Sequence, residues 1–422
     1  MPPPNDRRRF IKTVGAAAMA GWALPASGAA AHVASRPKVL RLQPRRIDSA
    51  LDQMVAAGRV AGASALIWQG GRERYFHATG FADREARRPL DRRTLFQIYS
   101  MTKPVTGVAL MQLWEQGRFH LDDPIARYLP QFAQMQVDRG AGGLSPASRP
   151  VLIRDLLRHT AGLSYGSGET AADLAYKRAD PLNPANDLAE AGRRLASLPL
   201  LADPGEIWSY SAAVDVQALL VETLAGEPFE AHVRRRVLEP LKMADTGWTQ
   251  PAAKLDRLAT VYVGGQQGGL VRQSDEQTRA NNFAPSRRLT MGGAGLVSSI
   301  DDYMRFCRML LAGGTLDGAK ILKPSTIRLM ASDQLDPAIT SRHFLPSKGS
   351  VGFGFDFAVR TAPPADPAEN RGEVGEFFWD GYASTLFWID PANDLAAVFL
   401  VQRIPFDGTL HHDFRNAVYG EA

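Results

Sequence analysis

Two short segments contain serines that neighbouring residues could turn into nucleophiles. Residues 100–103 read Ser-Met-Thr-Lys and match S-x-x-K, a pattern in which a lysine amine activates the serine in place of histidine. Residues 162–166 read Gly-Leu-Ser-Tyr-Gly and match G-x-S-x-G, the pattern of a nucleophile elbow. Both patterns are short enough to arise by chance, so the elements around each serine must decide between them.

The residues around Ser100 predict a strand, a turn and the start of a helix. A strand-like run, TLFQIYS, ends at Ser100, and a largely apolar helix suited to a core follows it. Pro104 has no amide donor and is tolerated only in the first turn, which places the helix start close to Ser100. Residues three apart share a helix face, so we expect the Lys103 amine beside the Ser100 hydroxyl. The alternative is an ordinary serine N-cap followed by a solvated lysine.

The residues around Ser164 do not predict an elbow, which needs a buried strand before the serine and a helix after it. Residues 151–160 instead have their apolar side chains at helical spacing. Gly162 followed by Leu163 is typical of a helix C-cap with the glycine in the left-handed conformation. We therefore expect Ser164 to be a loop residue near the catalytic centre and not the nucleophile.

Two further segments could complete a site around Ser100. Tyr210 and Ala212 lie at a loop-to-helix junction, where a phenol can project into a cleft. Residues 379–382, Trp-Asp-Gly-Tyr, precede a strand-like run, and Gly381 there would let a ligand approach the strand backbone closely.

The order S-x-x-K, then Y-x-x, then x-x-G resembles the serine β-lactamase and penicillin-binding superfamily, and specifically class C β-lactamases and family VIII carboxylesterases. The resemblance covers about residues 45–415 and includes four further stretches: LDDPIARYLP (121–130), LLRHTAGL (156–163), PGEIWSYS (204–211) and GGAGLVSSIDDYMRF (292–306). It implies that Ser100 is the acylated nucleophile and Lys103 its proton acceptor. Tyr210 would pass protons to the leaving group and activate the deacylating water. The oxyanion hole would be the backbone N–H groups of Ser100 and Tyr382.

Departures from the drug-hydrolysing members of this group concern the substrate. Trp379 stands where those members have a cationic residue that pairs with the substrate carboxylate. Asp380 would further disfavour anionic substrates if it faced inward, and Ala212 replaces an asparagine that holds a substrate amide. Together with Gly381, these are the expected substrate-binding residues, and they favour neutral esters over penicillins and peptidoglycan.

The expected function is therefore a serine carboxylesterase that hydrolyses neutral, short-chain esters and needs no metal or cofactor. One alternative is a class C-like β-lactamase or a D-amino-acid peptidase or amidase. The other is a non-catalytic penicillin-recognising protein, which the retention of serine, lysine and tyrosine argues against. His411 and His412 lack the spacing of metal ligands.

Strand patterns occur at both ends of the chain and helical patterns between them. Hairpin signals surround the Gly70-Gly71 turn and residues 390–394, whereas runs ending at Gly162, Gly226 and Gly313 have helical spacing. We expect an α/β protein of the α+β kind: a β-lactamase/transpeptidase-like antiparallel sheet flanked by helices. Residues 35–422 would form this domain, with a mostly helical subdomain inserted at about 120–290.

The N-terminus predicts export. Arg7, Arg8 and Arg9 precede an Ala-rich apolar run, and small residues follow it, as in a twin-arginine-type signal peptide. We expect residues 1–34 to be signal and linker, without a membrane span, and the mature protein to be periplasmic. This segment supplies three of the five formal positive charges, and the small remainder does not suggest a nucleic-acid partner. The single cysteine, Cys307, lies in a helical apolar pattern and is expected to be buried.

Overall fold

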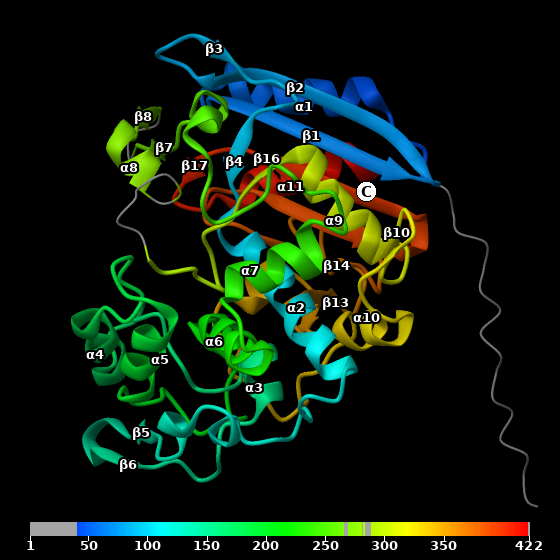
Figure 1. Cartoon of the computed structure of the whole chain (residues 1–422). Helices are drawn as coiled ribbons and strands as arrows, with labels where there is room; N and C mark the ends of the chain where they lie inside the picture. Colours follow the sequence, from blue (N-terminus) through cyan, green and yellow to red (C-terminus); the bar gives the residue numbers. More distant parts are fainter. Residues whose placement is uncertain (1–39, 266–268, 281, 283–287, 421–422) are drawn as a thin grey trace, which may run out of the picture. The chain divides into compact units, whose positions relative to one another are not determined.

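The computed structural model describes residues 40–265, 269–280, 282 and 288–420 (Figure 1). Pro37–Ala422 form one compact unit. The predicted export signal lies outside the described residues. In the part of the chain that is described, no helix combines the length and the hydrophobicity needed to cross a bilayer.

One antiparallel sheet of eight strands joins the two ends of the chain. Strand β1 pairs with β2 on one side and with β16 on the other, so the N-terminal hairpin lies beside the C-terminal hairpin, blue beside red in Figure 1. This confirms the predicted sheet and both predicted hairpins. In spatial order the strands are β12 (Val351–Phe353), β13 (Ala358–Arg360), β14 (Phe377–Asp380), β15 (Leu386–Asp390), β16 (Leu395–Leu400), β1 (Gly62–Gln69), β2 (Arg72–Asp83) and β3 (Arg88–Pro89).

Helices cover both faces of this sheet because its side chains alternate between two apolar layers. Trp388 on β15 contacts Phe414 of α11 (Gly408–Tyr419), which packs beside α1 (Pro44–Ala56). The preceding residue, Phe387, contacts Tyr303 of α9 (Ile300–Leu311) on the opposite face. Cys307 of α9 is buried and free, as predicted.

The helices most important for the site are α2 (Lys103–Glu115) and α6 (Ala213–Ala225). Both are buried over most of their length, and they pack against each other. Gly226 ends α6 in the left-handed conformation, as its pattern predicted. The other helices are α3 (Ile153–Leu157), α4 (Ala171–Ala179), α5 (Leu188–Ala196), α7 (Phe229–Val233), α8 (Asp275–Ala280) and α10 (Pro324–Met330).

Short strand pairs connect these parts. Strand β4 (Leu95–Gln97), which precedes α2 in the chain, pairs with β9 (Val297–Ser299). The remaining short strands are β5 (Gln136–Asp138) with β6 (Leu144–Pro146), β7 (Tyr262–Gly264) with β8 (Leu270–Arg272) and β17 (Arg403–Ile404), and β10 (Thr315–Leu316) with β11 (Ala319–Lys320).

Candidate active site

Ser100 and Lys103 lie side by side where a 3₁₀ turn, η1 (Tyr99–Thr102), runs into α2. The Lys103 Nζ atom donates hydrogen bonds to Ser100 Oγ at 3.2 Å and to the Gly293 carbonyl oxygen at 2.6 Å. The solvated-lysine alternative is wrong, because Lys103 is buried with its amine held between these two oxygens.

The pairing of β4 with β9 sets up this arrangement. Beyond the paired strands, the Ile98 N–H donates to the Leu296 carbonyl at 3.0 Å, and the Leu296 N–H donates to Thr102 Oγ1 at 3.2 Å. The loop that leads into β9 carries Gly293, so its carbonyl is placed against the first turn of α2. Tyr99 has a φ of 44°, a left-handed conformation that a non-glycine residue seldom adopts, immediately before the serine.

Burial lowers the pKa of Lys103 to about 8, since a charged amine is disfavoured away from water. The carboxylates of Asp215, Asp356 and Asp380 act in the opposite direction and raise it. A lysine with this pKa is neutral in a useful fraction of molecules near pH 8, so it can accept the proton of Ser100.

Tyr210 lies beside Lys103. Its ring centroid is 4.5 Å from Lys103 Nζ, and its hydroxyl oxygen accepts a hydrogen bond from the Trp379 indole at 3.2 Å. Burial raises the pKa of Tyr210, while the Ser100 hydroxyl and the Trp379 indole partly offset this effect. Tyr210 is therefore a phenol at neutral pH and can donate a proton, whereas Lys103 is the better placed acceptor.

The third motif packs directly against the serine turn. The Tyr382 ring lies 6.0 Å from the Tyr99 ring, centroid to centroid, and a Cβ atom at Gly381 would come within 2.6 Å of the Ile98 carbonyl oxygen. The assignment of the backbone N–H groups of Ser100 and Tyr382 to an oxyanion hole stays a prediction.

The strand expected after this motif is β15, and Trp379 and Asp380 themselves end a further strand, β14, which the sequence did not predict. Residues 381–385 form the turn between the two strands. The chain itself requires a glycine at position 381, since a Cβ there would also lie 2.3 Å from Thr385 Oγ1. The run FFWD is too short for periodicity to separate it from the strand that follows.

Asp380 does not face the pocket as a free anion, because it is paired with Lys348. Trp379 reaches Tyr210, but its side chain is almost fully covered, and Ala212 is buried at the N-cap of α6. The roles of Trp379, Asp380, Gly381 and Ala212 in substrate binding stay predictions.

Ser164 lies near the catalytic group but in a structural role. Its hydroxyl is buried, donates to Asp173 Oδ1 at 2.5 Å and accepts the Gly166 N–H at 2.8 Å. The predicted helix cap at Gly162 is wrong: α3 ends at Leu157, and His159 is the left-handed residue that follows it. Gly162 does have a φ of 77°, but what it permits is close packing against the Ala202 carbonyl oxygen.

Sequence reasoning missed two residues that support the site, His159 and Asp215. His159 packs against the Tyr210 ring at 4.9 Å and accepts the Ser211 N–H at 3.3 Å, and burial lowers its pKa well below the usual value. Asp215 accepts the Gly293 N–H at 3.1 Å from inside α6. An acidic side chain in an otherwise apolar helix, within AAVDVQALL, was the available signal for Asp215.

Comparisons with known proteins show the family and the fold of this chain. The family model described as Beta-lactamase matches residues 47–419. Esterase EstB from Burkholderia gladioli is 34% identical over 394 residues, which cover 89% of this chain and 94% of the esterase. The structure of EstCE1, described as a hydrolase with promiscuous acyltransferase activity, is 30% identical, has a TM-score of 0.75 and covers 89% of this chain and 98% of its own. Simvastatin synthase (LovD) from Aspergillus terreus, at 23% identity and a TM-score of 0.74, shares the fold over 88% of this chain and 97% of its own. These matches confirm the predicted resemblance and fold.

Proposed function

This chain belongs to the beta-lactamase family and is an esterase-type serine hydrolase, and we propose that it hydrolyses neutral, short-chain carboxylic esters through an acyl-enzyme on Ser100. The observation that carries the proposal is the buried Lys103 amine, 3.2 Å from Ser100 Oγ and with a pKa of about 8. Two similar proteins described as an esterase and a hydrolase support the reaction class.

The residues suggest the following order of proton transfers. Lys103 takes the proton of Ser100 as Oγ attacks the ester carbonyl, and the N–H groups of Ser100 and Tyr382 stabilise the oxyanion. Tyr210 donates a proton to the departing alkoxide and is reprotonated from Lys103, which leaves an acyl-enzyme and a free alcohol. Water then attacks the acyl carbonyl. One of its protons passes through Tyr210 and Lys103 to Ser100 Oγ as the carboxylic acid leaves.

The surroundings favour a neutral substrate. Trp379 supplies an apolar wall and an indole N–H that is already used by Tyr210. Lys348, whose Nζ atom lies 5.4 Å from the centroid of this tryptophan ring, is paired with Asp380. A substrate carboxylate would therefore lack the charge-assisted bond on which carboxylate recognition depends.

The test compares two serines. We expect Ser100→Ala to lower the kcat for 4-nitrophenyl butyrate at least about a thousandfold, since the nucleophile is lost. Ser164→Ala is the matched control, and it should keep most of the activity even though it removes two buried hydrogen bonds. The reverse result would contradict the assignment of the nucleophile.

A second measurement separates this function from its alternatives. Turnover of 4-nitrophenyl butyrate should exceed turnover of the β-lactam nitrocefin in kcat/KM. A preference for nitrocefin would favour the β-lactamase alternative, and no turnover of either compound would favour a non-catalytic protein. Mass spectrometry after reaction with an organophosphate should find the adduct on the peptide that contains Ser100.

A further inference from the structure

A buried ion pair lies at the end of β14, beside the candidate site. Lys348, the last residue of the 3₁₀ turn η7 (Leu345–Lys348), donates a hydrogen bond to Asp380. Only 7% of the Lys348 side chain and 10% of the Asp380 side chain are exposed. The two residues are 32 positions apart, so no local pattern pairs them.

The rings around Lys348 connect it to the catalytic group. Its Nζ atom is 4.2 Å from the Phe406 ring centroid, 5.7 Å from that of Phe344 and 5.4 Å from that of Trp379. Phe344 in turn packs on Tyr210 at 5.4 Å. The ammonium is therefore one aromatic ring away from the residue expected to protonate the leaving group.

Asp380 directs this ammonium to one side of the strand. Side chains alternate along β14, so Asp380 projects to the face opposite Trp379. His411 of α11 lies on that face, near the charges of Asp380 and Lys348. Burial lowers the pKa of His411 to about 4, so its ring is neutral at pH 7. The carboxylate of Asp380 is thus the charged partner of Lys348, and the pair as a whole carries no net charge.

We propose that Asp380 sequesters Lys348 and thereby makes the proposed esterase reaction selective for uncharged acyl groups and against acyl groups that end in a carboxylate. The proposal rests on the proposed function, because it assigns the specificity of that same reaction. A substrate carboxylate has to compete for Lys348 with a carboxylate that is already buried and hydrogen-bonded. Without Asp380, Lys348 is a buried cation without its partner, and a substrate carboxylate can supply the missing bond.

The experiment compares two substrates with the same number of acyl carbons, ethyl pentanoate and monoethyl glutarate, by titration of the acid released at constant pH. The quantity read is the ratio of kcat/KM for the glutarate to kcat/KM for the pentanoate, in which a general loss of activity cancels. Asp380→Asn should raise this ratio at least about tenfold, equivalent to about 1.4 kcal/mol. Lys348→Met leaves Asp380 as an unpaired anion and should lower it. The double variant should return to about the wild-type ratio.

Asp245→Asn is the matched control, since it also removes a carboxylate from an ion pair, with Lys254, but has no contact with the candidate site. Its ratio should equal that of the wild type. If Asp380→Asn fails to fold by circular dichroism, Lys348→Met tests the same pair with the opposite sign. An unchanged ratio in a folded single variant overturns the proposal. A wild type that hydrolyses neither ester contradicts the proposed function instead, so the two failures are distinct.

Discussion

The reactivity of Lys103 depends on a balance between burial and nearby carboxylates. Burial disfavours the charged amine, whereas Asp215, Asp356 and Asp380 favour it, and the net result is a pKa lowered to about 8. The Gly293 carbonyl holds the amine in place in either protonation state. The fraction of Lys103 that is neutral therefore grows as the pH rises through about 8, and activity should follow this titration.

We expect kcat/KM for a neutral ester to rise between pH 6 and pH 9, with a midpoint near the Lys103 pKa of about 8. The sign follows because only the neutral amine accepts the Ser100 proton, and its fraction grows as pH rises through the pKa. The measurement is the initial rate at low substrate, corrected for spontaneous hydrolysis.

Two lysine variants test the assignment of that midpoint. Lys103→Met cannot titrate and should be inactive at every pH, whereas Lys254→Met, which removes a lysine outside the site, should keep the midpoint. A flat profile, or a midpoint near the ordinary lysine value, would show that Lys103 is not the base.

At the scale of elements, a strand pair only three residues long brings the turn that carries Ser100 next to the loop that carries Gly293. Strand β4 leads into the serine turn, and β9 follows the loop that carries Gly293. The apolar spacing of α2 and its early proline were enough to predict Ser100 beside Lys103. The β4–β9 pair could not be predicted, because runs of three residues have no measurable periodicity and its two strands are far apart in sequence.

Gly293 is the position where this junction is tightest. A Cβ atom there would lie 2.6 Å from the Tyr165 hydroxyl, 2.9 Å from Asp215 Oδ2 and 3.3 Å from Lys103 Nζ. We expect Gly293→Ala to displace the carbonyl that holds Lys103 and to lower kcat by about a hundredfold. Gly247→Ala is the control, since its nearest neighbours would be 3.5 Å away. Equal rates for the two variants would show that the contact with Gly293 does not position the lysine.

At the scale of the whole molecule, the fold brings together residues that no local pattern relates. Apolar runs on either side of two turns, Gly70-Gly71 and residues 390–394, predicted the hairpins, the sheet and its use of both chain ends. The pairing of Lys348 with Asp380 and the packing of His159 on Tyr210 depend on loops whose course only the tertiary structure sets. The position of Trp379 on β14 was missed because the run FFWD is too short to show a periodicity of its own.

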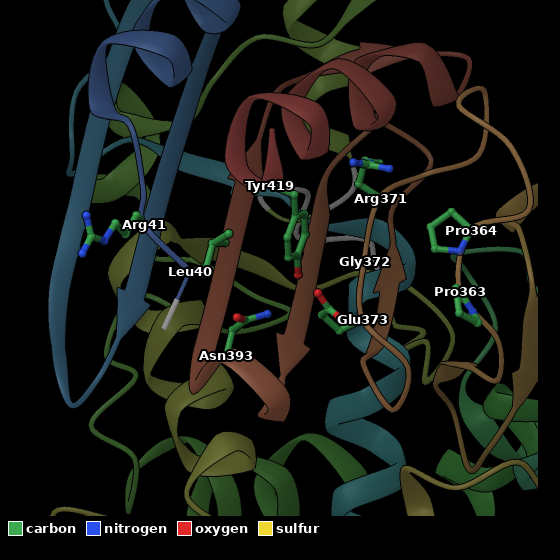
Figure 2. A pocket seen from close by; sticks show the side chains of 9 residues that line it. All are labelled: Leu40, Arg41, Pro363, Pro364, Arg371, Gly372, Glu373, Asn393 and Tyr419. Atoms are coloured by element: carbon green, nitrogen blue, oxygen red, sulfur yellow. The ribbon is translucent and has the colours of Figure 1, made fainter. Parts of the chain in front are cut away.

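A second cluster of charged side chains, which contains none of the predicted catalytic residues, links the start of β14 to α11. Glu376, just before β14, accepts hydrogen bonds from Arg360 at 3.1 Å and from Arg415 of α11 at 2.9 Å, and all three side chains are buried. Next to it lies a cavity of about 410 Å³, shown in Figure 2, where Tyr419 and the segment 371–373 line the walls. Neither Ser100 nor Lys103 lines that cavity.

This separation predicts a variant that loses stability and keeps its chemistry. Glu376→Gln leaves the buried Arg415 guanidinium without its anion, while Arg360 keeps Glu369, and the change should lower the free energy of unfolding by about 3 kcal/mol. Arg193→Ala, which breaks an exposed pair with Glu190, should leave the free energy of unfolding almost unchanged. Urea unfolding measures both, and the kcat/KM of folded Glu376→Gln should stay close to the wild-type value because the β4–β9 pair, and not this cluster, positions the serine turn. A loss of activity in the folded variant would mean that the charges at the start of β14 act on the site at its end.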